Sequence, residues 1–502
     1  MTLGLGLGSD SGDGGEELPG GSSTGLPEGW SRATLGELGE WFGGGTPSKK
    51  RPEFWTDGTI PWLSPKDMGP DVLVSTQDLI HESALGDSPA KLVPAGSVAL
   101  VVRSGILERK VPVTYVPFGV TLNQDMKAVA PHEGIDGRWL AWAIRAQENS
   151  ILENCRKRGT TVASLEVPWL MDTEILVPPA AEQQRIVGQI EEQVAHIEAG
   201  EEAAHAALSS ATSLAEQITA RGSRGCLEEV ELAPAPLEKA DIDDGAIPDL
   251  PADWGWARLG EVASVVGGVT KDSKRQGDPN YVEVPYLRVA NVQRGQLVLD
   301  DVTTIRVPPE KALSLRLQPG DILLNEGGDR DKLGRGWVWE GQVENCIHQN
   351  HVFRARVIGQ KIHPKLLAWH ANGFGKAWCD RNGTQSVNLA SISLRKIKLL
   401  PVPIPPQEIQ EQLVRTIELH LEGVAAARVT AEAALAQARD LRAALLYAAF
   451  TGTLVPQDPA DEPASALLDR IRAARLTAKA APRRHAPRKP RPAPPGQGEL
   501  PE

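Results

Sequence analysis

The sequence has few cysteines, no long apolar run and no basic residue near its start. The four cysteines, Cys155, Cys226, Cys346 and Cys379, lie far apart without a Cys-x-x-Cys pair, which favours a reducing cytoplasm over a disulfide framework. No stretch approaches the ~20 apolar residues that a membrane span requires, so we expect a soluble, cytoplasmic protein. No Lys or Arg precedes Arg32 and no apolar segment follows, which excludes a secretory signal.

Motifs for cofactors and metals are also scarce. The sequence contains neither the Asn-Pro-Pro-aromatic nor the Asp-Pro-Pro-Tyr motif of methyltransferases. Its Gly-Lys pair is followed by Ala377, which lacks the hydroxyl that binds Mg²⁺ in a P-loop. Cys346, His348 and His351 offer zinc ligand types, but their spacing fits no standard set. We therefore expect this chain to bind no cofactor and no metal.

Charge is distributed unevenly along the chain. The formal net charge is −12, which by itself argues against binding to nucleic acid. Residues 254–398, however, hold 21 Lys and Arg against 14 Asp and Glu, whereas residues 180–253 are strongly acidic. Residues 30–178 are closer to neutral and carry local basic clusters. The pattern predicts phosphate-binding surfaces on the two globular segments, more clearly on the second.

The most informative feature is an internal repeat. At an offset of 224 residues, four stretches match: 26–30 with 250–254, 35–37 with 259–261, 60–63 with 284–287, and 159–162 with 383–386. After a small insertion the offset becomes 227 and aligns 177–183 with 404–410. Between these landmarks the copies differ almost everywhere. The chain is therefore two copies of one scaffold of roughly 220 residues, with two different surfaces.

Each copy has a globular part and a helical part. The first ~150 residues of a copy are rich in Gly and Pro with short β-type runs such as 97–102 and 321–324, which indicates an α+β domain with irregular loops. A Pro-Pro pair then ends the sheet and begins a helix. The expected organisation is a disordered leader (1–25), a domain (26–180), a helix (181–222), an acidic linker (223–249), a second domain (250–404), a second helix (405–450) and a partly disordered tail (451–502).

The two helices carry matching apolar seams. Apolar or small residues recur three and four residues apart over more than four heptads in each, which is typical of a coiled coil. At the offset of 227, Ile190, Ile197, Ala204, Ala211 and Ile218 align with Ile417, Val424, Ala431, Ala438 and Leu445. We expect the two seams to bury each other. A helix of ~40 residues is ~60 Å long, so such a pair would separate two domains.

These features together resemble the specificity subunits of type I restriction-modification systems. The resemblance covers residues 26–456, although the second copy has Gly267-Gly-Val-Thr where Gly-Gly-Thr-Pro-Ser is usual. The motifs that carry it are Leu26-Pro-x-Gly-Trp30, Gly43-Gly-Gly-Thr-Pro-Ser48, Phe54-Trp55, Ile60-Pro-Trp62, the Gly159-Thr-Thr and Gly383-Thr-Gln turns, the Pro-Pro-x-x-Glu-Gln helix start and Ala449-Phe-Thr-Gly-Thr-Leu454.

The resemblance implies a fold, a function and partners. The fold would be two α+β target-recognition domains separated by two long antiparallel coiled-coil helices, related by a pseudo-twofold repeat. The function would be to recognise a bipartite, asymmetric site in double-stranded DNA without catalysis by this chain. The partners would be two modification (methyltransferase) subunits, which methylate adenine, and motor-nuclease restriction subunits, which cleave. S-adenosylmethionine, ATP and Mg²⁺ would bind to those partners.

Candidate DNA-contact residues are the basic and amide side chains in the Gly-rich loops. In the first domain these are Lys49, Lys50, Arg51, Lys66, Arg103, Arg156, Lys157, Arg158 and Thr160. In the second domain they are Lys271, Lys274, Arg275, Arg288, Asn291, Arg330, Lys332, Arg335, Asn382, Thr384 and Gln385. Each of these side chains, taken singly, is equally consistent with solvated surface.

Two other functions remain open at this point. Asp71 with Glu108-x-Lys110 matches the loose spacing of a metal-dependent nuclease, in which carboxylates would hold Mg²⁺. A tandem-repeat scaffold that binds only proteins is the other alternative. The Arg- and Pro-rich tail from Arg483 to Arg491 is most simply a solubilising terminus.

Overall fold

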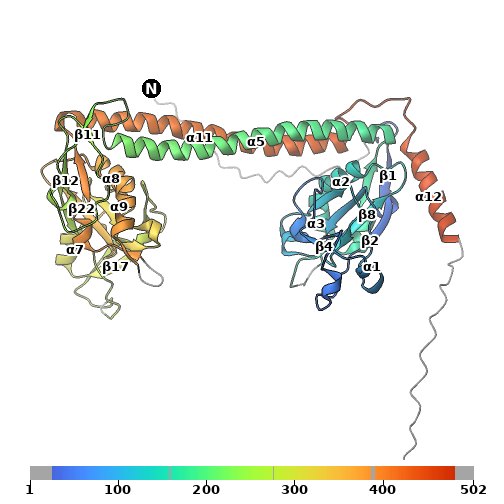
Figure 1. The fold of residues 1–502 in the computed structure, drawn as a ribbon, viewed down its shortest axis with the longest axis horizontal. Helices are drawn as coiled ribbons and strands as arrows, with labels where there is room; N and C mark the ends of the chain where they lie inside the picture. The colour runs from blue at the N-terminus through green and yellow to red at the C-terminus, as the bar shows by residue number, and fades with distance from the viewer. Residues whose placement is uncertain (1–24, 158, 160, 275, 386–389, 481–502) are drawn as a thin grey trace, which may run out of the picture. The chain divides into compact units, whose positions relative to one another are not determined.

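The chain forms two compact units in the computed structural model (Figure 1). The structure describes residues 25–480 except 158, 160, 275 and 386–389. Of these residues, module 1 comprises those in 25–200 and 437–480, and module 2 comprises those in 201–436. The predicted leader lies almost wholly outside the described residues, as do residues 481–502 of the predicted tail. No helix in the described part of the chain is long and apolar enough to cross a membrane.

Module 1 contains two sheets and a base formed by its first and last strands. Its strands are β1 (Ser31–Thr34), β2 (Gly39–Gly43), β3 (Ile60–Leu63), β4 (Asp78–Ile80), β5 (Ser97–Val101), β6 (Val113–Val116), β7 (Thr121–Leu122), β8 (Met126–Pro131) and β9 (Glu174–Val177). Its short helices are α1 (Ser83–Asp87), α2 (Gly137–Ala146), α3 (Glu148–Asn154) and α4 (Val167–Asp172). One sheet has the order β2-β8-β5-β6 and is antiparallel, and the other has the order β4-β3-β7 with β3 parallel to β7.

Strand β5 is buried along its whole length because both faces of its sheet are covered. Successive side chains of a strand point to opposite faces. Val98 and Leu100 therefore belong to the larger core with α2, whereas Ala99 and Val101 belong to a second core beneath the other sheet. The apolar run that indicated a strand in the sequence is this central strand.

Module 2 repeats this architecture. Its strands are β10 (Leu232–Ala233), β11 (Leu250–Pro251), β12 (Gly255–Arg258), β13 (Ala263–Val266), β14 (Val282–Leu287), β15 (Val292–Gln293), β16 (Gln296–Leu297), β17 (Thr304–Val307), β18 (Ile322–Asn325), β19 (Gly327–Gly328), β20 (Gly336–Val338), β21 (Ile347–His348), β22 (Val352–Val357), β23 (Thr384–Gln385), β24 (Ala390–Ser391) and β25 (Pro401–Ile404). Its short helices are α6 (Leu259–Val262), α7 (Pro309–Leu315), α8 (Pro364–Asn372), α9 (Phe374–Asn382) and α10 (Leu394–Ile397).

The two modules share strand order and register. The sheets β13-β22-β18-β20 and β17-β14-β21 correspond to the two sheets of module 1, and β14 is parallel to β21 as β3 is to β7. At the base, Ser31 opposite Val177 corresponds to Gly255 opposite Ile404. The predicted repeat of an α+β domain is confirmed.

The two long helices, α5 (Ala180–Gly222) and α11 (Gln407–Phe450), pack against each other in both modules. In module 1, Ile190 and Ile197 near the start of α5 share a core with Leu445 and Ala449 near the end of α11. In module 2 the ends are exchanged, and the later part of α5 packs with the start of α11 through residues such as Ile218 and Ile417. The pairing is antiparallel, which confirms the predicted coiled coil.

A glutamine explains why the same motif begins both helices. Gln183 donates to the carbonyl of Pro178 and accepts from the backbone N–H of Asp136, the residue that caps α2. Its counterpart Gln410 donates to the carbonyl of Pro405 and accepts from the N–H of His363, which caps α8. These hydrogen bonds fasten the first turn of each long helix to its own module.

The segment that follows each long helix returns to a module. In module 1, a final helix α12 (Ala464–Ala480) buries Leu467, Leu468 and Ile471 in the main core. Residues 451–502 were expected to form a partly disordered tail, so α12 is an addition to the predicted organisation. In module 2, the acidic linker 223–249 lies against the domain through specific polar contacts that include Asp244.

Candidate DNA-contact loops

A three-residue turn lies between two strands at the same place in each module. In module 1 it is 123–125, between β7 and β8, and in module 2 it is 349–351, between β21 and β22. The glycine-rich motif packs directly on it: a Cβ at Gly44 would lie 1.7 Å from the carbonyl oxygen of Asn123, and a Cβ at Gly268 would lie 2.5 Å from that of Gln349. Only glycine permits such an approach, which explains why both copies have glycine here.

The first basic cluster of module 1 follows the glycine-rich segment. Lys49 and Lys50 are exposed. Arg51 pairs with Glu53 at 2.7 Å and lies over the ring of Phe54 at 4.0 Å, so its guanidinium is partly neutralised. Lys66, after β3, pairs with Asp78 at 2.7 Å, which raises the pKa of the lysine. These four side chains stay proposals as DNA contacts.

The second basic cluster of module 1 is brought together by backbone pairing. Arg103 forms a bridge with Ser164, and Arg156 forms a bridge with Leu165, so the chain segments around 103, 156 and 164 lie side by side. Arg103 also donates its N–H to the carbonyl of Asp125 in the turn. Arg103, Arg156 and Lys157 are all exposed. Arg158 and Thr160 lie outside the described residues, and so does Arg275 of module 2.

In module 2, one cluster surrounds Arg330. Its guanidinium pairs with Asp380 and donates to the side-chain oxygen of Gln385 at 3.1 Å. Strand β23, which contains Thr384 and Gln385, pairs with β24, and β24 pairs with β19 just before Arg330. Lys332 pairs with Asp329 on the same short segment. Four of the candidate residues therefore share one surface.

Other candidates of module 2 lie apart from that cluster. Lys271 and Lys274 are exposed in the segment after the glycine-rich motif. Arg288 is half-buried and pairs with Asp301 at 2.9 Å. Arg335 is half-buried, and its carbonyl accepts from the N–H of Asn325. These residues stay proposals as well.

Two predicted asparagines are used inside the protein. The buried Asn291 donates to the carbonyls of Val298 and Asp301 and accepts from the N–H of Arg288. Asn382, also buried, donates to the carbonyls of Asp243 and Trp378. Their amides are occupied by backbone partners, so we omit both from the proposed DNA-contact surface. Sequence alone does not distinguish an amide that reads a base from one that fastens a loop.

The structure adds candidates that the sequence analysis missed. Gln124 is exposed in the first turn, and Gln349 and Asn350 are half-exposed in the second. Amide side chains of this type pair with adenine in the major groove. Aligning the copies at an offset of 226 would have revealed that both have a short polar stretch between two apolar strands.

Residues of both possible metal sites, the nuclease site at Asp71 and the zinc site at Cys346 and His348, are paired with other protein groups or buried. Asp71 pairs with the half-buried Arg145 at 2.8 Å. His348 is buried, its Nδ1 lies 2.6 Å from the carbonyl of Val352, and burial lowers its pKa to about 4. Burial raises the pKa of Cys346 to about 12. Within the described residues, no group of three or more metal-binding side chains comes together.

Comparison with known proteins identifies the module. The family model of the type I restriction modification DNA specificity domain matches residues 27–203. The EcoR124I/EcoR124II specificity subunit of Escherichia coli is 49% identical over 154 residues, and the StySPI specificity subunit of Salmonella potsdam is 23% identical over 472 residues, 90% of this chain and 96% of that protein. The chain is thus similar to type I restriction-modification specificity subunits, and residues 27–203 match the model of their DNA specificity domain.

The extent of the likeness varies among the specificity subunits. The alignment spans 31% of this chain and 38% of the EcoR124I/EcoR124II subunit. It spans 54% of this chain and 60% of the MjaIX specificity subunit of Methanocaldococcus jannaschii, at 24% identity. The chain therefore aligns with less than two thirds of the length of either relative.

Solved structures support the fold. The HsdS subunit of Thermoanaerobacter tengcongensis superposes with a TM-score of 0.53 at 20% identity, covering 86% of this chain and 99% of that one. A chain from a study of complex assembly and conformational transition of the type I restriction-modification system superposes with a TM-score of 0.64 at 19% identity, covering 86% and 100%. These likenesses support a fold of two modules with a linking coiled coil for this chain.

Proposed function

We propose that this chain is the DNA-reading, non-catalytic subunit of a type I restriction-modification complex in the cytoplasm. Each module contacts one part of a bipartite, asymmetric site in double-stranded DNA. Two modification subunits methylate adenine and motor-nuclease subunits cleave, with S-adenosylmethionine, ATP and Mg²⁺ on those partners.

One observation carries the proposal: the modules share a scaffold strand by strand, yet carry different polar side chains on equivalent loops. The turns 123–125 and 349–351 occupy the same place in the two sheets. Their sequences are Asn-Gln-Asp and Gln-Asn-His, and each turn is flanked by a different set of basic residues. A constant frame with variable polar loops suits two readers of different base sequences.

A nuclease acting alone is less consistent with these contacts. Its required carboxylate, Asp71, pairs with Arg145, and that arginine also donates to the carbonyl of Val113 at 2.7 Å. This arrangement uses Asp71 to join α2 to the neighbouring loop rather than to hold a metal ion.

The test is co-expression of the full chain with its cognate modification subunits, followed by sequencing that detects methylated adenine. We expect a single interrupted motif with two unlike halves. Arg103→Ala combined with Arg156→Ala should weaken methylation at least tenfold, because phosphate and base contacts in module 1 are lost. Arg470→Ala on α12 is the control and should leave the motif and rate unchanged. Absence of a motif, or a continuous palindrome, would overturn the proposal.

A further inference from the structure

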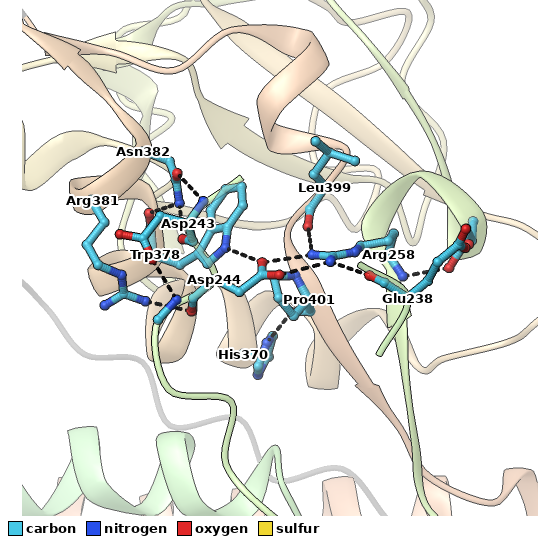
Figure 2. A network of polar contacts seen from close by, with 12 residues as sticks. Glu238, Asp243, Asp244, Arg258, His370, Trp378, Arg381, Asn382, Leu399 and Pro401 are labelled. Carbon is cyan, nitrogen blue, oxygen red and sulfur yellow. Dashed lines mark hydrogen bonds and ion pairs between the residues drawn. The ribbon is translucent and has the colours of Figure 1, made fainter. Parts of the chain in front are cut away.

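The acidic linker supplies a carboxylate to the interior of module 2 (Figure 2). The carboxylate of Asp244 accepts two hydrogen bonds from the guanidinium of Arg258, at 2.8 and 2.9 Å, and one from the indole N–H of Trp378 at 3.0 Å. Arg258 is only 5% exposed and lies at the end of β12, and Trp378 is fully buried in α9. Burial alone would raise the pKa of Asp244, but these donors outweigh it and lower the pKa.

A second set of contacts joins the linker to the last turn of α9. The amide of Asn382 donates to the carbonyl of Asp243 at 2.7 Å and accepts from its N–H at 3.3 Å, as a neighbouring strand would. Arg381 donates to the carbonyl of Asp244 at 3.0 Å. Figure 2 shows Trp378, Arg381 and Asn382 all directed toward residues 243 and 244. The end of α9 is therefore held by the linker through three of its side chains, those of Trp378, Arg381 and Asn382.

The same end of α9 supports the Arg330 cluster. Asp380 in this turn pairs with Arg330, which in turn donates to Gln385 at 3.1 Å. Gln385 follows Asn382 by three residues. The carbonyl of Asn382 also accepts from Lys396 of α10 at 2.8 Å. A shift of the last turn of α9 would therefore displace Arg330 and Gln385 together.

We propose that Asp244 is a positioning residue for DNA recognition by module 2. Residues 238–245, here called the linker latch, hold the last turn of α9 and thereby the surface formed by Arg330, Thr384 and Gln385. The linker is thus part of the second reader, although it precedes that domain in the sequence. This inference rests on the proposed function.

The chain offers a matched control for the Asp244 pair. Asp321 is 1% exposed, and its carboxylate accepts two hydrogen bonds from Arg356 at 2.6 and 2.7 Å. It lies at the start of β18 and also accepts from the N–H of Gln318. It is therefore a bidentate Arg–Asp pair of the same kind in the same module, and the partners of its carboxylate, Arg356 and Gln318, lie outside α9. Asp321→Asn should destabilise module 2 without moving the Arg330 cluster.

The experiment uses the full chain in complex with its modification subunits. Binding is measured to three unmethylated duplexes: one with the motif found by methylation sequencing, and two in which one or the other half is scrambled. Discrimination at a half is the ratio of affinities for the intact motif and for the duplex with that half scrambled. The half read by module 2 is the one whose scrambling no longer matters after Arg330→Ala with Gln385→Ala. At fixed salt, Asp244→Asn should reduce discrimination at that half roughly 10- to 100-fold, the range of one or two base contacts. Discrimination at the other half should be unchanged.

Further variants separate positioning from stability. Trp378→Phe removes one donor to Asp244 but keeps a large ring, so we expect a smaller loss at the same half. Asp321→Asn should lower thermal stability but leave both discrimination ratios intact. The inference fails if Asp244→Asn leaves the discrimination ratios unchanged. It also fails if Asp244→Asn lowers the ratio at both halves equally, or if Asp321→Asn lowers the ratios as Asp244→Asn does. Lack of discrimination by the unmodified complex would instead overturn the proposed function.

Discussion

The two modules have the same sheet topology, but the segments that cover them are held by different interactions. Module 1 is covered by α12, whose Leu467, Leu468 and Ile471 are buried in its core. Module 2 is covered by an extended linker whose main contact is the ion pair of Asp244 with Arg258. Apolar burial is not directional, whereas a carboxylate that accepts three hydrogen bonds fixes the position of its donors. The same scaffold is thus stabilised by burial of apolar side chains in module 1 and by directional hydrogen bonds of a carboxylate in module 2.

A single pair of equivalent positions helps to explain this difference. Gly134 has a φ of +89°, and a Cβ there would lie 2.5 Å from a terminal methyl of Leu467 in α12. The position that aligns at an offset of 227 is Lys361, which lines an open pocket of about 590 Å³ together with Glu261. In module 1 the counterpart of Glu261 is Glu37, which pairs with Arg472 of α12. Lys361 is exposed and its Nζ donates to the carbonyl of Glu261 at 2.9 Å, so a charged side chain lies here where module 1 has a glycine under α12.

The largest expected effect comes from the core of α12. Leu468→Ala should cost module 1 about 2–5 kcal/mol, since a fully buried leucine is truncated. Leu476→Ala, on the exposed side of the same helix, should change stability by less than about 0.5 kcal/mol. Hydrogen exchange read peptide by peptide checks both. An equal loss of protection in module 2 would contradict the separation of the two cores.

Acidification should weaken module 2 more than module 1. Burial lowers the pKa values of His348 and His370 to about 4, below the ordinary 6.5. Both are neutral when folded, so their stability contribution is present above pH 6.5 and is lost as pH falls toward 4. Between pH 7.5 and 5 the loss is about 2 kcal/mol per histidine. In module 1, His132 is only half-buried, and burial lowers its pKa as well.

Urea unfolding at the two pH values, followed by hydrogen exchange in each module, measures this difference. His370→Asn should make the free energy of unfolding of module 2 less dependent on pH. Substitution of the exposed His81 should leave the pH dependence of module 1 unaltered. Equal acid sensitivity of both modules would show that the buried histidines do not determine it.

The smallest effect concerns the ion pairs of the two closures. A double-mutant cycle on Glu37 and Arg472, a largely exposed pair at 3.1 Å, should give a coupling below about 1 kcal/mol. The same cycle on Asp244 and Arg258 should give about 1–3 kcal/mol, because this pair is buried and bidentate. Equal coupling energies would contradict the idea that the ion pair matters more for the linker of module 2 than for α12 of module 1.

The repeat and the coiled coil could be predicted because they are periodic. A seam such as Ile190 to Ile197 and a landmark such as Trp30 matching Trp254 depend only on spacing along the chain. The apolar residues of α12 also have helical spacing, but they have no counterpart in the repeat and lie next to a polar tail. They are buried against residues of the first domain, such as Gly134, that lie more than 300 residues away in the sequence.

The candidate site could be predicted only in outline. Lys49 and Arg103 are exposed as a basic loop residue should be, but nothing local distinguishes them from Asn291 or Asn382, whose amides bind backbone. The importance of the 123–125 turn follows from the close approach of Gly44, which is a tertiary contact. Local composition indicated where polar loops are, whereas partner geometry decides which of their side chains remain available.

The pairing of β1 with β9, and of β12 with β25, places the entrance and exit of each domain next to each other. Everything between Thr34 and Glu174 is therefore an insertion whose two ends are joined by a short ladder, an arrangement that tolerates exchange of the inserted part. Under the proposed function, replacing the inserted segment would change the loops offered to DNA while leaving the joints to the long helices in place.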